Sequence, residues 1–477
     1  MRLINRRFYG GAGLNSPLTR LKCCLAGCCL LFSGLLPVGA LGQITELVGP
    51  LLPSPTLPAA PSQPATAPGQ QPSYAGETVT SRPRPEFDPI GLRFDDYFWF
   101  PRAEVDEAYN SNIFATSSKP TTDLITALVP SFDLISIFSK NALNLHGASV
   151  LDFYANHSAQ NTQDGTVSAD GRYDVTAGSS FFGTAQVAHQ HISYGSPNSP
   201  GSPTSPAAIA EPVTYWTYAG RAGYAQGGRR LSWGVDGGSI SAQYNAAPLV
   251  GGGSLPQSSQ DATVSDVALR VSYEIAPDYL GYVRLDGALY DYWHTAPGET
   301  FRPNSKTYRA DFGLQILPRH IVYGQVYTGY LVQTFDQSSL GSTSTPDYGG
   351  RLVWNVTPLT TLTFNGLRTF ITGSFANPVT GVSGPAGNGY LASTVQAVAD
   401  HELFRNLLLN ANFIYENDSF QGITRTDNVY TASGGVRYLV NRHLFLGGNV
   451  TFQERTSTLP GNSYTQYVVM GRIGTQF

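Results

Sequence analysis

The chain has 477 residues, a length that fits several soluble domains or one large barrel. Charged residues make up 13% of it, against roughly 25% in soluble globular proteins, whereas Gly (51) and Tyr (27) are abundant. The mean hydropathy is -0.13, so the chain is not hydrophobic overall. This composition suits strands that alternate apolar and small polar residues, in a membrane barrel or in soluble β-sandwiches. A net charge of -4 gives no basis for nucleic-acid binding.

Residues 1–42 have the pattern of a secretory signal peptide. Basic residues precede an apolar run from Cys23 to Leu36, and small residues offer a cleavage site before Gln43. All four cysteines lie in this run, so the mature chain contains no disulfide and no cysteine metal site. A lipobox-like sequence ends at Cys28, but the apolar run continues past it, which favours cleavage near residue 43 over lipidation. No later stretch is apolar enough for a transmembrane helix.

Residues 43–96 form a second kind of segment, rich in Pro between positions 50 and 89 and otherwise composed largely of Ala, Ser, Thr and Gln. Such a sequence cannot bury enough apolar surface to fold by itself, so we expect a disordered, partly polyproline II segment in the periplasm. It could act as a tether or docking arm, or be a plain disordered tail.

From residue 97 to residue 477 the pattern is period-two alternation, which predicts β-strands. Between Leu280 and Trp293, for example, Val283 and Leu285 share one face of the strand. Arg284 and Asp286 share the other face. Residues 308–316 and 444–455 alternate in the same way. No segment of comparable length keeps a helical period.

Short and long connections also alternate along this region. Short turns are expected at 176–178, 226–228, 276–278, 318–320, 357–359, 404–406 and 441–443. Longer polar loops are expected at 194–212, 246–261, 294–305, 336–346, 373–389, 421–427 and 456–463. Outer-membrane barrels have short periplasmic turns and longer extracellular loops. The fold class predicted is therefore all-β: a transmembrane antiparallel up-and-down β-barrel of about 18 strands, with about 16 as the alternative.

Closure of the barrel requires the first strand, near 99–109, to pair with the last, near 464–477. In lipid an open edge would leave peptide groups unpaired, at a cost of about a few kcal/mol each. The last strand alternates and ends on Phe477, an aromatic residue at the carboxyl terminus. We interpret Phe477 as an assembly signal, which makes outer-membrane lipid and the barrel-assembly machinery the expected partners.

Short motifs in this region resemble a known family. They are the stretch from Tyr109 to Thr116 followed by Asp123, Val129-Pro130, the stretch from Tyr438 to Leu444, and Arg455-Thr-Ser457. With these motifs the chain, from about residue 94 to its end, resembles the putative outer-membrane β-barrel porin family of Gram-negative bacteria. The resemblance implies an outer-membrane location and a link to extracellular polysaccharide production, and it carries over no catalytic residue.

Charged residues fall opposite the apolar face of the predicted strands and are the candidates for lining a pore. They are Asp266, Arg270, Glu274, Arg284, Asp286, Arg309, Asp311, Arg351, Arg437, Arg455 and Arg472. Rings of such charges set solute selectivity in channels. Seven Arg against four acids favour a small anionic or saccharide solute. The alternative is that these groups pair with one another and fill the lumen.

Catalytic and metal-binding patterns are weak. His189 and His191 share one strand face, a spacing that could bind a metal, but no third ligand is identifiable. The Gly-rich stretch from Gly251 to Ser254 lies in a loop rather than between a strand and a helix, and no nucleophile elbow occurs. We therefore predict no enzyme activity, no catalytic residue, no cofactor and no metal.

The predicted function is an outer-membrane porin or channel for passive passage of small hydrophilic or saccharide solutes, with a link to polysaccharide export. An 18-stranded barrel is wide enough for an aqueous channel. The alternative is a structural or surface-interaction barrel with a filled lumen, acting through extracellular loops such as 194–212.

Overall fold

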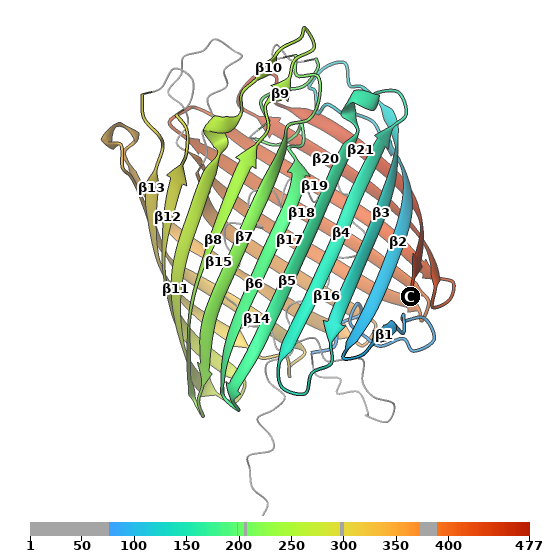
Figure 1. The fold of residues 1–477 in the computed structure, drawn as a ribbon, viewed down its shortest axis with the longest axis vertical. Coiled ribbons are helices and arrows are strands. Elements are labelled where there is room, and N and C mark those ends of the chain that lie inside the picture. Colours follow the sequence, from blue (N-terminus) through green and yellow to red (C-terminus); the bar gives the residue numbers. More distant parts are fainter. Residues whose placement is uncertain (1–75, 198, 205–207, 296–299, 373–388) are drawn as a thin grey trace, which may run out of the picture.

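The computed structural model describes residues 76–197, 199–204, 208–295, 300–372 and 389–477, which fold into a closed antiparallel β-barrel (Figure 1). The predicted signal peptide and the first part of the Pro-rich segment lie outside these residues. Among the described residues, no helix has the length and apolar character needed to cross a membrane.

The predicted fold class is confirmed: the barrel has 18 strands, joined in chain order. They are β2 (Tyr97–Asn110), β3 (Asp123–Ser136), β4 (Ala142–Tyr154), β5 (Thr162–Thr176), β6 (Ser179–His191), β7 (Thr214–Gly227), β8 (Leu231–Tyr244), β11 (Ala262–Ala276), β12 (Tyr279–Tyr292), β13 (Ser305–Ile316), β14 (Val322–Phe335), β15 (Ser342–Thr357), β16 (Thr360–Ile371), β17 (Gly389–Phe404), β18 (Leu407–Gln421), β19 (Thr426–Leu439), β20 (Leu444–Ser457) and β21 (Tyr464–Gln476). Short strands β1 (Leu92–Phe94), β9 (Ala247–Pro248) and β10 (Ser254–Leu255) lie outside the barrel wall.

The first and last barrel strands close the wall. β2 pairs with β3 on one side and with β21 on the other, where Arg102 lies opposite Gln476 and Asn110 opposite Val468. Every barrel strand thus has two antiparallel neighbours, and the wall has no open edge to expose peptide groups to lipid.

Among the described residues the connections alternate as expected; residues 296–299 and 373–388, within two of the predicted long loops, lie outside the described residues. In two of the short turns, only residues 177–178 and 277–278 separate the strands. In the second of these, Asp278 has a φ of 68°, a left-handed conformation that Asp tolerates in tight turns. Following the arrangement of outer-membrane barrels, we place the short turns at the periplasmic end.

Two of the predicted loops are shorter than expected because strands extend into them. β15 begins at Ser342, so that Pro346 lies within the ladder opposite Tyr330. β18 and β19 are separated by residues 422–425 alone. Ser, Thr, Gly and Pro in these stretches are typical of loops, but here their backbone continues the pairing of the neighbouring strand.

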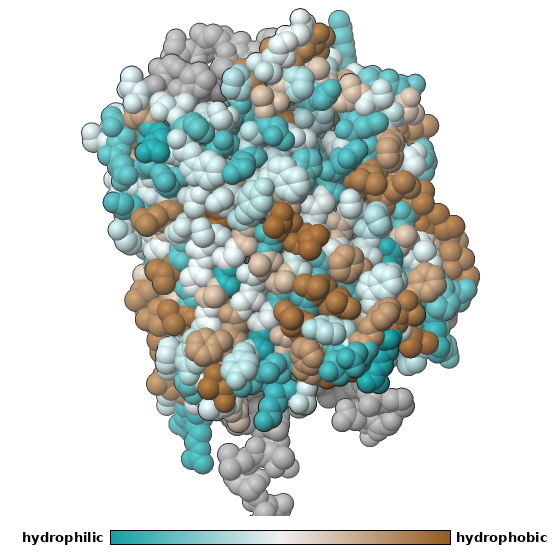
Figure 2. Space-filling model, in the orientation of Figure 1, coloured by the Kyte–Doolittle hydropathy of each residue, from teal (hydrophilic) through white to brown (hydrophobic). Residues whose placement is uncertain are grey.

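The outer face of the wall is apolar between two rows of aromatic residues. Figure 2 shows hydrophobic side chains over the middle and lower wall and hydrophilic ones around the loops. Outward aromatic residues near the loop end are Trp216, Tyr218, Tyr308, Tyr330, Tyr348, Tyr430 and Tyr467, and those near the turn end include Tyr173, Phe181, Trp233, Tyr273, Trp354, Phe404, Tyr438 and Phe477. Such paired girdles mark the two membrane interfaces of outer-membrane barrels.

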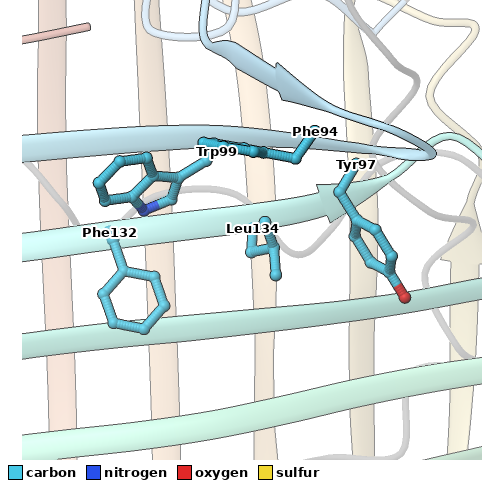
Figure 3. Close-up of a pocket in the computed structure, with 5 residues that line it drawn as sticks. All are labelled: Phe94, Tyr97, Trp99, Phe132 and Leu134. Carbon is cyan, nitrogen blue, oxygen red and sulfur yellow. The ribbon is translucent and has the colours of Figure 1, made fainter.

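At the turn end, β1 folds back on β2 and extends the aromatic surface. Phe94 and Trp99 lie 6.0 Å apart between ring centroids, and together with Tyr97, Phe132 and Leu134 they line a shallow apolar groove (Figure 3). The groove lies on the outer wall, because Phe132 and Leu134 alternate with inward-facing Ser and Asp residues of β3. It is a surface suited to the acyl chains of the inner leaflet.

The segment from residue 76 to residue 91, here called the strap, is packed against the inside of the turn end. The Tyr323 hydroxyl donates to the carbonyl of Gly76 at 3.0 Å, and the Asn355 amide donates to the carbonyl of Glu77 at 2.8 Å. Further along, the backbone N–H of Val79 donates to the Thr361 hydroxyl at 3.0 Å. The strap therefore follows β14, β15 and β16 in order around the rim.

The second half of the strap continues around the rim to β21. Arg84, only 4% exposed, forms an ion pair with Glu402 of β17 at 2.8 Å. Arg442, in the turn before β20, donates to the carbonyl of Pro85, and Gln476 of β21 donates to that of Phe87 at 3.2 Å. Where the sequence predicted disorder through residue 96, the structure shows residues 76–96 ordered, because the barrel supplies the buried surface and partners that the segment lacks by itself.

Candidate functional site in the barrel lumen

Alternation and closure place one face of every strand inside the barrel. The structure places all eleven predicted pore-lining residues on this inward face. Asp311 lies opposite Arg284, and Arg309 lies opposite Asp286, in the ladder of β12 and β13. Ion pairs between strands that are not neighbours confirm the inward orientation. Side chains two strands apart can meet only on the concave, inner side of the wall.

The wall formed by β7 to β15 contains a network of buried ion pairs. Arg221 of β7 reaches past β8 to Asp266 of β11 at 2.6 Å, and it also contacts Asp236. Arg309 of β13 reaches past β14 to Asp347 of β15 at 2.8 Å. Both members of this second pair are 5% exposed or less. Arg221 and Arg309 are thus neutralised by adjacent carboxylates.

Arg270 is held by an aromatic ring and by side-chain amides. Its guanidinium carbon lies 3.8 Å from the centre of the Tyr282 ring, and it donates to Gln315 at 2.7 Å. The ring covers Gly313, where an added Cβ would lie 2.3 Å from the ring. Glycine at this position therefore makes room for the tyrosine, and the tyrosine orients the arginine.

A second charged cluster lies where the barrel closes. Arg472 of β21 contacts Glu104 at 2.8 Å and Asp106 at 2.7 Å, both on β2. Arg437 of β19 lies over the Phe445 ring at 4.2 Å. The contacts of Arg472 join β21 to β2, the last and first strands of the barrel, from the inside.

A row of uncharged amides crosses the inward face. Asn365 of β16 lies opposite Gln396 of β17, and Asn412 of β18 lies diagonally across from Gln396, opposite Val398. Asn365 donates to Gln396 at 2.9 Å, and Gln396 donates to Asn412 at 3.0 Å. The same level continues through Arg351 to Gln325 of β14. This amide row offers hydrogen-bonding groups without net charge along several adjacent strands.

The described part of the loop between β6 and β7, residues 192–197, 199–204 and 208–213, folds over the extracellular mouth; we call it the inner loop. Its Gly195 carbonyl accepts a hydrogen bond from Arg455 of β20, which is only 5% exposed. Its Tyr194 ring packs 5.5 Å from that of Phe114, and its hydroxyl donates to Gln160. Burial raises the pKa of the Tyr194 hydroxyl, which keeps it neutral. The inner loop therefore narrows the mouth instead of projecting into the medium.

The structure adds many inward charges that the sequence-based set did not contain. The inward carboxylates of the barrel strands are Glu104, Asp106, Asp123, Asp133, Asp152, Asp164, Asp170, Asp174, Asp236, Asp266, Glu274, Asp286, Asp311, Asp347, Asp400, Glu402, Glu416, Asp418 and Asp427, and the inward arginines are Arg102, Arg172, Arg221, Arg270, Arg284, Arg309, Arg351, Arg437, Arg455 and Arg472. Carboxylates outnumber guanidinium groups, so the seven-to-four balance of the predicted set does not represent the whole lumen.

His189 and His191, the pair considered as possible metal ligands, contact different partners. His189 packs against Trp216 at 4.8 Å between ring centroids and contacts the carbonyl of Gln163 at 2.8 Å. His191 contacts Asp164 at 2.8 Å. In the part of the chain that the structure describes, no group of three or more His, Cys, Asp or Glu side chains has the arrangement of a metal site.

Residues 84–477 match the family model described as "Putative beta-barrel porin 2". The chain belongs to this porin family. It is accordingly an outer-membrane β-barrel of a Gram-negative bacterium, as its closed wall, girdles and connections indicate. Comparison with curated protein sequences gave no significant match.

Solved porin structures share the barrel only loosely. OpdK from Pseudomonas aeruginosa is 10% identical, with a TM-score of 0.40 over 80% of this chain and 99% of its own. OccK2 (OpdF) from the same species, in complex with glucuronate, is 8% identical. Its TM-score is 0.42 over 81% of this chain and 100% of its own. A BenF-like porin from Pseudomonas fluorescens Pf-5 is 10% identical, with a TM-score of 0.42 over 80% and 99%. At these values none of them informs the solute of this chain.

Proposed function

We propose that this porin-family barrel is a passive channel for small hydrophilic solutes across the outer membrane. The observation that carries the proposal is the exposure of two carboxylates on the inward face of β3 and β5. The side chains of Asp133 and Asp170 are 54% and 45% exposed there, although both face the lumen. Asp133 lies three residues from the turn end of β3, so this exposure supports entry of water into the lumen from that end.

Saccharides are the solute class we would test first. Sugars are recognised through many hydroxyl groups, and the amide row formed by Asn365, Gln396 and Asn412 offers both donors and acceptors for them. An outward path for polysaccharide would use the same lumen. An anionic solute was the other sequence-based expectation, and the excess of inward carboxylates gives it less support than a neutral sugar.

Liposome swelling tests this function. Purified barrel in multilamellar vesicles should admit arabinose and glucose rapidly and larger oligosaccharides progressively more slowly, while vesicles without protein admit none. Equal, slow swelling in all sugars, with the barrel shown to be folded by its heat-modifiable gel mobility, would refute a passive channel.

A structural or surface-interaction barrel is the second candidate, and the inner loop favours it. With Arg455 and the inner loop covering part of the mouth, the extracellular end could be closed to solutes. In that case permeability would be absent, and deletion of loop residues would alter surface binding alone.

Processing and assembly complete the proposal. We propose that residues 1–42 are removed as a signal peptide and that residues 43–75 lie in the periplasm before the strap. Outer-membrane lipid surrounds the girdles, and the barrel-assembly machinery recognises the last strand. Phe477 is 43% exposed at the periplasmic edge and packs 5.2 Å from His443 between ring centroids, a position open to such recognition.

A further inference from the structure

The lumen has an uneven distribution of accessible charge. On the β7 to β15 wall, guanidinium groups such as Arg284 and Arg309 are buried and lie against carboxylates. At the closure cluster, Arg472 is likewise held between two acids. A guanidinium that is buried and paired contributes little field to the water path, since its carboxylate partner cancels most of it.

The β3 to β5 wall is different, because two of its carboxylates, Asp133 and Asp170, are exposed. His146 of β4 lies between them, with Nδ1 2.6 Å from Asp133 and Nε2 2.9 Å from Asp170. Its own side chain is 37% exposed. Two carboxylates and one imidazole remain negative overall whether the imidazole is neutral or charged. The neighbouring ion pair of Arg172 and Asp174, 3.0 Å apart, adds no net charge.

The next strand does not offset this negative wall. On β6 the inward neighbours Thr184 and Gln186 are exposed and uncharged. The opposing positive group is Arg351, exposed on the inward face of β15, far around the barrel from β4. Asp133 and Asp170 thus expose negative charge on one side of the lumen, and Arg351 exposes positive charge on the opposite side.

We infer that the channel conducts cations in preference to anions, and that Asp133 and Asp170 set this preference while Arg351 moderates it. The inference rests on the proposed channel function. A unit charge about 5 Å from a hydrated ion changes the local ion concentration about fourfold before screening by salt. Because accessible charges act on permeating ions directly, a pair of exposed carboxylates outweighs a larger set of buried, compensated ones.

The test is the reversal potential of the purified full-length barrel in a planar bilayer under a tenfold KCl gradient. The wild type should have a potassium-to-chloride permeability ratio above one. The double variant D133N/D170N should lower this ratio by about two- to fourfold, and R351Q should raise it. E107Q is the matched control, because Glu107 lies on the outer face of β2, hydrogen-bonded to Thr126, and its loss should leave the ratio unchanged.

The outcomes separate the two proposals. A conducting wild-type channel with a ratio at or below one, or a folded D133N/D170N channel with the wild-type ratio, would overturn the inference while leaving the channel function intact. A folded barrel that never conducts would overturn the channel function and the inference with it. The single variant D133N, which leaves His146 bonded to Asp170, gives an intermediate shift if the double variant fails to assemble.

Discussion

Replacing Glu402 by Gln should release the strap from the periplasmic rim. Glu402 is 3% exposed and holds Arg84, itself 4% exposed, at 2.8 Å. It also lies 3.8 Å from Arg82 and from Arg405. The amide keeps the size of the side chain but removes its charge, so the variant would leave the Arg84 guanidinium buried without a counter-charge.

The magnitude follows from the burial of this pair. Removing one member of a buried ion pair costs about 3–5 kcal/mol, chiefly because the remaining charge stays desolvated. The strap can avoid that cost by leaving the rim, since it is joined to the barrel at one end only among the described residues. At about 1.4 kcal/mol per factor of ten, the population of detached strap should rise about 10²- to 10³-fold.

Hydrogen exchange of the strap measures this population. The backbone N–H of Val79, bonded to the Thr361 hydroxyl in the wild type, should exchange about 10²- to 10³-fold faster in E402Q. D278N is the matched control: it neutralises a carboxylate in another turn, 3.2 Å from Arg319, and should leave strap exchange unchanged. Unchanged exchange at Val79 in E402Q would show that the ion pair does not hold the strap.

Three further outcomes are expected from the fold. V469K, which puts a charge on the lipid face near the middle of β21, should destabilise the barrel by about 2–4 kcal/mol in urea titrations in vesicles. V468K, one residue away on the lumen face, should destabilise it much less. Equal losses of stability would contradict the assigned faces. F477A should lower the yield of folded barrel in cells on heat-modifiability gels, and F404A, at another exposed aromatic on the same rim, should not; equal losses would remove the special role of Phe477. R455A should free the inner loop and increase current noise in single-channel records, so an unchanged noise spectrum would argue against its anchoring.

Much of the barrel could be predicted from the sequence because its two physical determinants are local. Period-two alternation determines which side chains face lipid, and turn residues such as Pro277-Asp278 indicate where the chain reverses between strands. Counting back from Phe477 then orients every connection. Strand ends such as Ser342 and Thr426 were misplaced because Ser and Thr fit both a loop and a paired, half-polar strand.

The lumen could be predicted only in part. Alternation identified residues such as Arg284 as inward. The same rule, applied to the polar, Gly-rich strands that contain Asp133 and Asp170, would have identified these two residues as well. It could not reveal that Arg309 is paired with Asp347, because that contact skips a strand and depends on curvature. Ordering of the strap could not be predicted either, since its partners lie more than 240 residues away in the sequence.

The most direct test of the account is single-channel recording of the purified barrel in a planar bilayer. A passive channel should give discrete conductance steps in the wild type, and the steps should grow when the strap is released by E402Q. A correctly folded barrel that gives no steps under either condition would contradict the claim that its lumen is a water-filled path.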